Sequence, residues 1–154
     1  MPLSTQDQIG IYAAVLRRLY GPDDTFGGTF QAPVAYVLRQ TDDAASGLSP
    51  APSASVILPP EVQLGIGAAL ADLPTRILWV GDFMDVPRDS QTGAVIGRGA
   101  AFRLGNLAPQ ADGSVHVAGS IYVASLAAGG ATFVVVLQGG QWVVTGNTGS
   151  QWMS

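Results

Sequence analysis

The feature that most constrains this chain is a series of strand-like runs in its second half, joined by very short turns. Apolar and β-branched residues gather in five runs: 76–82, 94–104, 114–126, 131–138 and 141–145. Turn residues such as Ala111-Asp112-Gly113, Gly129-Gly130 and Gly139-Gly140 separate them. A parallel return needs a crossover of about a dozen residues. We therefore expect neighbouring strands to be antiparallel and to form a meander.

The first half favours helices. Ser4 with Asp7 three residues later is typical of a helix N-terminus, apolar residues then recur at helical spacing, and Gly21-Pro22 ends the pattern. Pro59-Pro60 opens a second helix over 61–73. Its expected buried stripe consists of Val62, Ile66, Ala69 and Leu70. Residues 33–39 form a strand-like run, and 42–55, rich in Ala, Ser, Pro and Gly, is expected to be a mobile surface loop.

Together these patterns predict an α+β fold. Two helices would pack on a curved antiparallel meander sheet of five to six strands. A chain of 154 residues is long enough to bury a substantial core, and we expect residues 1–154 to form one domain.

The charge content is unusually low. Charged residues make up 12% of the chain, against about 25% in a typical globular protein, with seven arginines and no lysine. A surface with so few charges is typical of a protein that binds another protein molecule. We therefore expect a homo-oligomer or a protein partner. The alternative is that Gln, Ser, Thr and Asn solvate the surface.

Composition also excludes several classes of function. Without cysteine the chain has no disulfide, zinc-thiolate site or cysteine nucleophile. A net charge of −4 with scattered arginines argues against nucleic-acid binding. The longest apolar run is about six residues, so no membrane span is expected. No signal peptide is visible at the start, although a leader removed earlier would leave the same sequence; an exported location is slightly favoured over a cytoplasmic one.

The order of elements resembles the cone-shaped nuclear-transport-factor-2-like (NTF2-like) and cystatin-like folds. The segments 41–43, 113–122 and 142–149, with Trp152, are similar to an uncharacterised family of bacterial, often exported, proteins. The cone-shaped folds host isomerases, dehydratases, epoxide hydrolases and binding modules, so the resemblance implies a fold without choosing a function. The Asp-Arg-Asp group of the epoxide hydrolases cannot be matched to this chain residue by residue.

The candidate catalytic residues are His116, Tyr122 and Asp82. On the strand 114–126 alternation places the valines at 115, 117 and 123 on one face and His116, Ser120 and Tyr122 on the other. Histidine titrates near neutral pH and can act as a general base, with Tyr122 or Ser120 beside it. The alternative is a half-exposed strand face without catalytic function.

The candidate ligand-binding residues are Arg39, Arg103 and Trp79. Each arginine lies on a predicted strand and needs solvent or an acid, and Arg39 with Asp42 or Asp82 is a plausible structural pair. A clamp for a ligand carboxylate is the alternative. The aromatic residues supply core packing or the lining of a pocket for a small apolar ligand.

We expect no metal site and no cofactor. Asp42 and Asp43 are interpreted as solvated acids beside a loop, and Asp89 as the first residue of an Asx-type turn. The favoured function is a non-enzymatic binding or self-assembly module. A small-molecule enzyme of hydrolase or isomerase type, with its pocket between helices and sheet, and a structural subunit of an exported filament or surface assembly stay open as alternatives.

Overall fold

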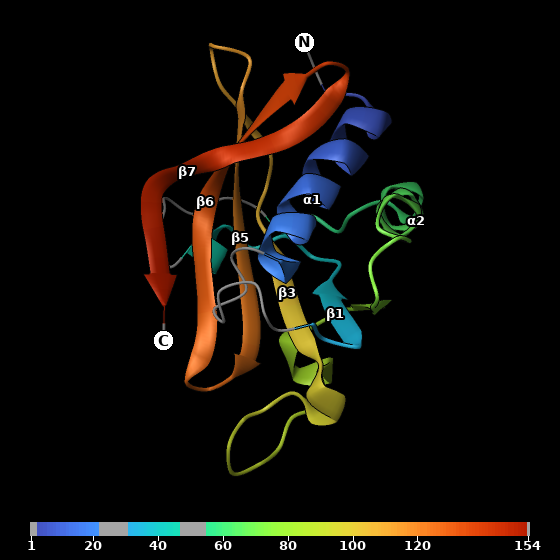
Figure 1. Cartoon of the computed structure of the whole chain (residues 1–154), viewed down its shortest axis with the longest axis vertical. Coiled ribbons are helices and arrows are strands. Elements are labelled where there is room, and N and C mark those ends of the chain that lie inside the picture. Colours follow the sequence, from blue (N-terminus) through green and yellow to red (C-terminus); the bar gives the residue numbers. More distant parts are fainter. Residues whose placement is uncertain (1–2, 22–30, 47–54, 154) are drawn as a thin grey trace.

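The computed structural model describes residues 3–21, 31–46 and 55–153 (Figure 1). Its α-helices are α1 (Thr5–Tyr20) and α2 (Pro60–Ala69), and its short 3₁₀ helices are η1 (Asp43–Ser46), η2 (Phe83–Asp85) and η3 (Ile96–Arg98). The strands are β1 (Val34–Leu38), β2 (Arg76–Val80), β3 (Ala100–Leu104), β4 (Ala108–Pro109), β5 (Val115–Ala124), β6 (Ala127–Gln138) and β7 (Gln141–Met153). The α+β class is confirmed, and the seven strands of the described residues exceed the five to six expected.

Helix α1 begins and ends where the sequence predicts. The Ser4 hydroxyl accepts a hydrogen bond from the Asp7 amide, and the Asp7 carboxylate accepts one from the Ser4 amide, both at 3.1 Å. This reciprocal pair satisfies two of the amide donors that a helix start leaves unpaired. At the other end the Gly21 amide donates to the Arg17 carbonyl. The predicted apolar stripe is buried in the core, including Tyr12 and Leu16.

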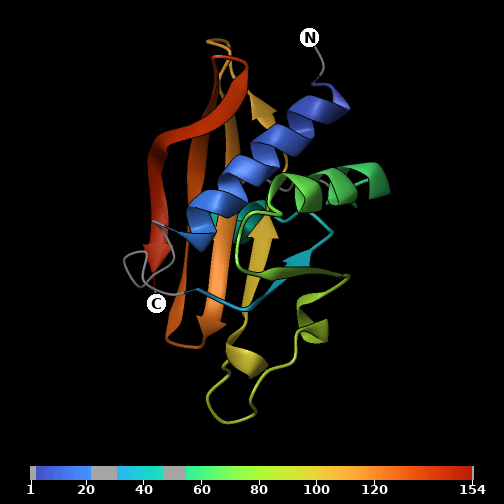
Figure 2. The ribbon, with the colours of Figure 1, turned by 45° about the vertical axis from the view of Figure 1, so that its right-hand side comes forward.

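Helix α2 is shorter than the predicted 61–73 and buries a narrower stripe. Val62, Ile66 and Leu70 are buried, but Ala69 is exposed, so its predicted burial is wrong. Ala69 is the last residue of α2 and lines the open groove beside Arg17, whose side chain donates to the Ala69 carbonyl at 3.1 Å. Figure 2 shows the two helices side by side on the same face of the sheet.

The order of strands corrects the predicted meander. The sheet runs β2-β1-β3-β5-β6-β7, and β1 pairs in parallel with both β2 and β3. The β1–β2 connection contains α2 and is long enough for a parallel crossover. Residues 81–99 then carry the chain past β1 to its other side. Only β3, β5, β6 and β7 form the expected antiparallel meander.

Several strand limits also differ from expectation. The predicted strand 94–104 is a strand only from Ala100, because Gly97 and Arg98 both have positive φ and bend the chain before it. Gly129-Gly130, expected to be a turn, lies inside β6 and pairs with β5 and β7. The predicted loop 42–55 begins with the ordered η1, and its residues 47–54 lie outside the described residues.

The sheet has a packed layer on each face. On the helix side the core includes Phe102 and Phe133, and a cavity between Leu16 of α1 and Val37 of β1 measures about 10 Å³. On the other face Val86 and Val95, from the 81–99 connection, pack on Ala101. Among the described residues no helix is both long enough and apolar enough to cross a membrane.

Candidate functional site

The three candidate catalytic residues do not come together as one site. His116 and Tyr122 share a face of β5 but are six residues apart, about 20 Å along the strand. His116 is half-buried between Ala108 and Val134 on the neighbouring strands. Asp82 is exposed and caps η2, where its carboxylate accepts a hydrogen bond from the Met84 amide at 2.9 Å. Asp82 therefore does not accompany the histidine; the acid whose charge interacts with His116 is Asp112, in the turn before β5.

The candidate ligand-binding residues lie on two faces of the sheet. Arg39 donates through Nη2 to the Trp79 carbonyl at 3.1 Å, and Trp79 packs against the helix-side core. Arg103 lies on the opposite face, where its Nη1 is 3.8 Å from an Asp42 carboxylate oxygen. The structural pairing expected for Arg39 and Asp42 is therefore made by Arg103 instead.

A small cleft on the sheet face opposite the helices brings two predicted residues together. Arg103 from β3 and Tyr122 from β5 line it, with Ser120 between them and Trp152 from β7 at the far side. The cleft has a volume of about 120 Å³. Phe83, from η2, closes the remaining side. One candidate ligand-binding residue, Arg103, and one candidate catalytic residue, Tyr122, therefore line the same cleft.

The side chains of the cleft are held in place by ring contacts and hydrogen bonds. The Phe83 ring meets the Tyr122 ring edge-on at 5.0 Å, and the Arg103 guanidinium lies 4.7 Å from the centre of the Phe83 ring. The Tyr122 hydroxyl donates to the Gly93 carbonyl at 2.8 Å, and the Trp152 indole donates to the Ala45 carbonyl at 2.8 Å. That last bond attaches the final residues of β7 to η1.

The acidic residues serve local structure. Asp89 accepts hydrogen bonds from the Gln91 and Thr92 amides, which confirms the predicted turn and lowers the pKa of its carboxyl group. Asp43 is half-buried rather than solvated as expected, because it accepts from the Asn106 amide at 2.7 Å. Burial raises the pKa of the nearby Tyr12 hydroxyl, and the Asp43 charge adds to this rise. Within the described ranges, no three acidic or histidine side chains gather as metal ligands.

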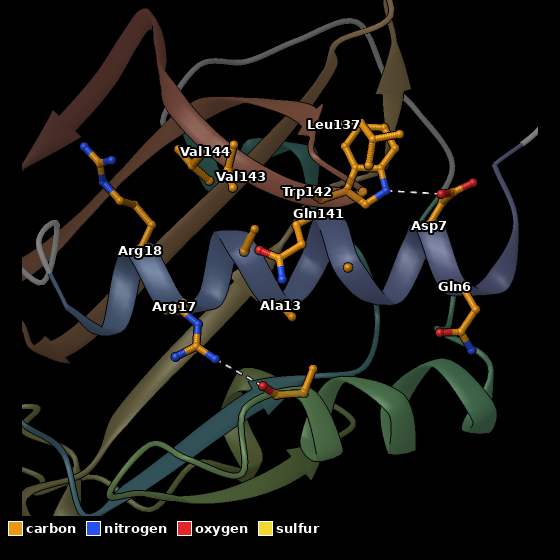
Figure 3. Close-up of a pocket in the computed structure, with 14 residues that line it drawn as sticks. Gln6, Asp7, Ala13, Arg17, Arg18, Leu137, Gln141, Trp142, Val143 and Val144 are labelled. Atoms are coloured by element: carbon orange, nitrogen blue, oxygen red, sulfur yellow. Dashed lines mark hydrogen bonds between the residues drawn. The ribbon is translucent and has the colours of Figure 1, made fainter.

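A larger open groove, of about 890 Å³, runs between α1 and the first residues of β7 (Figure 3). Its walls are mostly small or apolar side chains: Gly10, Ala13 and Ala14 on the helix, and Leu137, Trp142, Val143 and Val144 on the strands. The Trp142 indole leans on Gly10 and donates to the Asp7 carboxylate at 3.1 Å. Hydrogen bonds from Ser4 and Trp142 lower the pKa of Asp7.

The strands that end the chain carry no charge. All seven arginines and all eleven acidic residues precede Gly113, so β5, β6 and β7 contain none of them. Within the described part of the chain β7 pairs only with β6, and its other edge makes no strand pairing. Figure 1 shows β7 along one side of the molecule, bending sharply near its middle. Its segment Gln141–Val144 borders the groove as well.

Sequence reasoning missed Phe83 and the groove residue Gly10. Phe83 follows β2 and precedes Met84 in a stretch without clear periodicity, so only tertiary contact identifies it as a cleft residue. Gly10 interrupts the helix pattern of α1, and a glycine within a helix is itself a signal of close packing by a neighbour. Gly10 therefore indicates a close neighbour, and the structure identifies that neighbour as Trp142.

Comparisons of this chain with protein-family models, with curated proteins and with solved structures found no match.

Proposed function

We propose that this protein is a non-enzymatic self-assembly module that joins a second copy of itself through the outer edge of β7. The observation that carries the proposal is the character of that edge: a strand of 13 residues without one charged side chain. A strand edge offers unpaired amides and carbonyls to any strand that approaches it.

Natural proteins protect exposed edges in a few known ways. They shorten the edge strand, place lysine or proline on it, or bend it with bulges. β7 contains no charge and no proline. Its two irregularities of pairing with β6, opposite Ala131–Phe133 and Val134–Val135, divide it into shorter straight segments. The first of these, at Gln141–Val144, is the segment beside the groove.

Pairing of two copies through Gln141–Val144 satisfies both features at once. Two-fold pairing is antiparallel and sets the same four residues of each copy against each other. The alternate side chains of the added strand face the groove between α1 and β7, where Leu137 is 54% exposed. Because β5, β6 and β7 carry no charge, no like charges meet across the new strand pair. A two-fold contact of this kind closes at the dimer, so filaments need a second surface.

The experiment is analytical ultracentrifugation of the chain at increasing concentration, with Val143→Lys as the test variant. The substitution places a lysine on the pairing edge of each copy, where natural edge strands carry lysine to prevent pairing, and we expect the dissociation constant to rise at least about tenfold. The control is Val136→Lys, because Val136 pairs with Val143 within the sheet but lies on the interior strand β6.

Three outcomes contradict the proposal. The first is a wild-type chain that is monomeric at every concentration. The second is a Val143→Lys variant that assembles as well as wild type. The third is equal loss of assembly in both variants, which indicates that the sheet face rather than the β7 edge makes the contact. Thermal melts of all three proteins establish that each is folded.

We also propose kinship with the cone-shaped NTF2-like and cystatin-like folds and with exported bacterial proteins. Two helices on one face of a mostly antiparallel sheet support it at the level of architecture. A solved structure of this chain, compared strand by strand with those folds, is the test. A sheet order different from theirs at β1 contradicts the kinship.

A further inference from the structure

We infer that the cleft on the sheet face binds a small carboxylate attached to a planar or apolar group. This site lies on the face of the sheet, away from the segment Gln141–Val144, and does not depend on self-assembly. The residues that line the cleft come from β3, β5 and β7, together with Phe83 of η2.

The floor of the cleft is a row of cross-strand neighbours. Arg103 on β3 lies opposite Ser120 on β5, Ser120 opposite Gly130 on β6, and Gly130 opposite Trp152 on β7. A side chain at Gly130 would overlap the Ala45 carbonyl and the Trp152 indole. The glycine at 130 therefore lets the Trp152 indole lie close over β6, and the cleft lies between this indole and Arg103, above Ser120.

Arg103 is held in place but keeps its hydrogen-bonding capacity. Its guanidinium lies against the Phe83 ring, and its distance of 3.8 Å to Asp42 exceeds the 2.7–2.9 Å of a charge-assisted hydrogen bond. Among the described residues, the Phe83 ring and the Asp42 carboxylate are the interaction partners of its guanidinium. The side chain is 36% exposed, so its donors are accessible from the cleft.

The chemistry of the lining selects the ligand. A guanidinium presents two parallel donors that match a carboxylate. The adjacent Ser120 hydroxyl is a further donor at the same end of the cleft. Phe83, Tyr122 and Trp152 form the remaining walls and favour a flat apolar body. The cleft volume of about 120 Å³ is slightly below the roughly 150 Å³ of a cavity that holds benzene, so a single-ring ligand is the upper limit of size and part of it must extend through the open side.

The test is isothermal titration of the full chain with benzoate as the anionic probe and benzamide as its neutral counterpart. We expect benzoate to bind and benzamide to bind at least about tenfold more weakly. Arg103→Gln is expected to weaken benzoate binding by a similar factor. The matched control is Arg76→Gln, which removes an exposed arginine from the distant edge strand β2 and is expected to leave binding unchanged.

A second variant gives an effect of opposite sign. The Asp42 carboxylate competes with the ligand carboxylate for Arg103. Asp42→Asn removes this charge but keeps an oxygen that can accept from the Ala44 amide. We expect Asp42→Asn to bind benzoate a few-fold more tightly, a gain that a damaged fold does not produce. Absence of benzoate binding, equal binding of benzamide, or unchanged affinity in both Arg103→Gln and Asp42→Asn would overturn the inference.

Discussion

β2 and β7 are the two edge strands of one sheet, yet they differ in length, charge and surroundings. β2 has five residues, begins with Arg76 and is followed by Asp82. β7 has 13 residues and no charge. A short edge with charged ends offers few backbone groups to a passing strand, whereas a long uncharged edge offers many. The comparison shows that length and charge restrict pairing at the β2 edge, whereas the β7 edge is long and uncharged and is interrupted by two irregularities of pairing.

The two strands also differ in how they are attached to the rest of the molecule. β2 is paired in parallel with β1 along its whole length, and its residue Trp79 packs into the helix-side core. β7 is attached at both ends by tryptophans, Trp142 to Asp7 and Trp152 to Ala45. The middle of β7 is largely exposed. Substitutions at the attached ends of β7 and at the β2 edge therefore test how the two edges differ.

The largest effect is expected from Gly130→Ala. The added methyl group overlaps the Ala45 carbonyl and the Trp152 indole, so the end of β7 must move away from η1. Overpacking of this kind costs about 1–3 kcal/mol in the free energy of unfolding. The measurement is urea denaturation followed by tryptophan fluorescence.

The control for that substitution is Gly146→Ala on β7 itself. A methyl group at Gly146 meets no atom within 4 Å, so we expect little change. Equal destabilisation by the two substitutions would show that loss of glycine flexibility, rather than displacement of Trp152, is responsible.

A smaller and pH-dependent effect is expected from Asp7→Asn, which loosens the other end of β7. The pKa of Asp7 is lowered below its ordinary value of 3.8 by hydrogen bonds from Ser4 and Trp142. The ionised carboxylate therefore stabilises the fold above that value, and this contribution is lost as the pH falls through the lowered pKa. The stability difference between wild type and Asp7→Asn should be constant near neutral pH and shrink in acid.

Denaturation curves at several pH values test this dependence, together with amide exchange at Gln141–Val144, which should speed up in Asp7→Asn. Asp112→Asn is the comparison, since the pKa of Asp112 is also lowered, mainly by the Ser114 hydroxyl, but in the turn before β5. Faster exchange at Gln141–Val144 in Asp112→Asn as well would contradict the specific role of the Asp7–Trp142 bond.

The smallest effect is expected from Arg76→Gln at the β2 edge. If charge alone protected this edge, its removal would create a second associating surface. Because β2 is only five residues long and parallel-paired, we expect sedimentation to match wild type and stability to change by less than about 0.5 kcal/mol. New oligomers larger than those of wild type would show that charge, rather than length, separates the two edges.

The local features were predictable because their causes are local. The Ser4–Asp7 capping pair, the end of α1 at Gly21 and the Asp89 turn each depend on residues a few positions apart. The low charge that motivated the assembly hypothesis is likewise a property of composition. The alternation expected along β5 failed where tertiary packing covers both faces, since Ser120 is buried as well as Val117.

The neighbours of each strand were decided only by the tertiary structure. Hydrophobic pattern indicates that residues 34–38 form a strand, but not that this strand lies between β2 and β3. The cleft depends on that order, since Phe83 reaches Arg103 and Tyr122 only because the 81–99 connection crosses the sheet face. Sequence by itself determined the two helices, the central parts of most strands and the distribution of charge, because these follow from short-range chemistry. The strand order, and with it the cleft and the open edge, follows from packing between residues far apart in the chain, which no local pattern encodes.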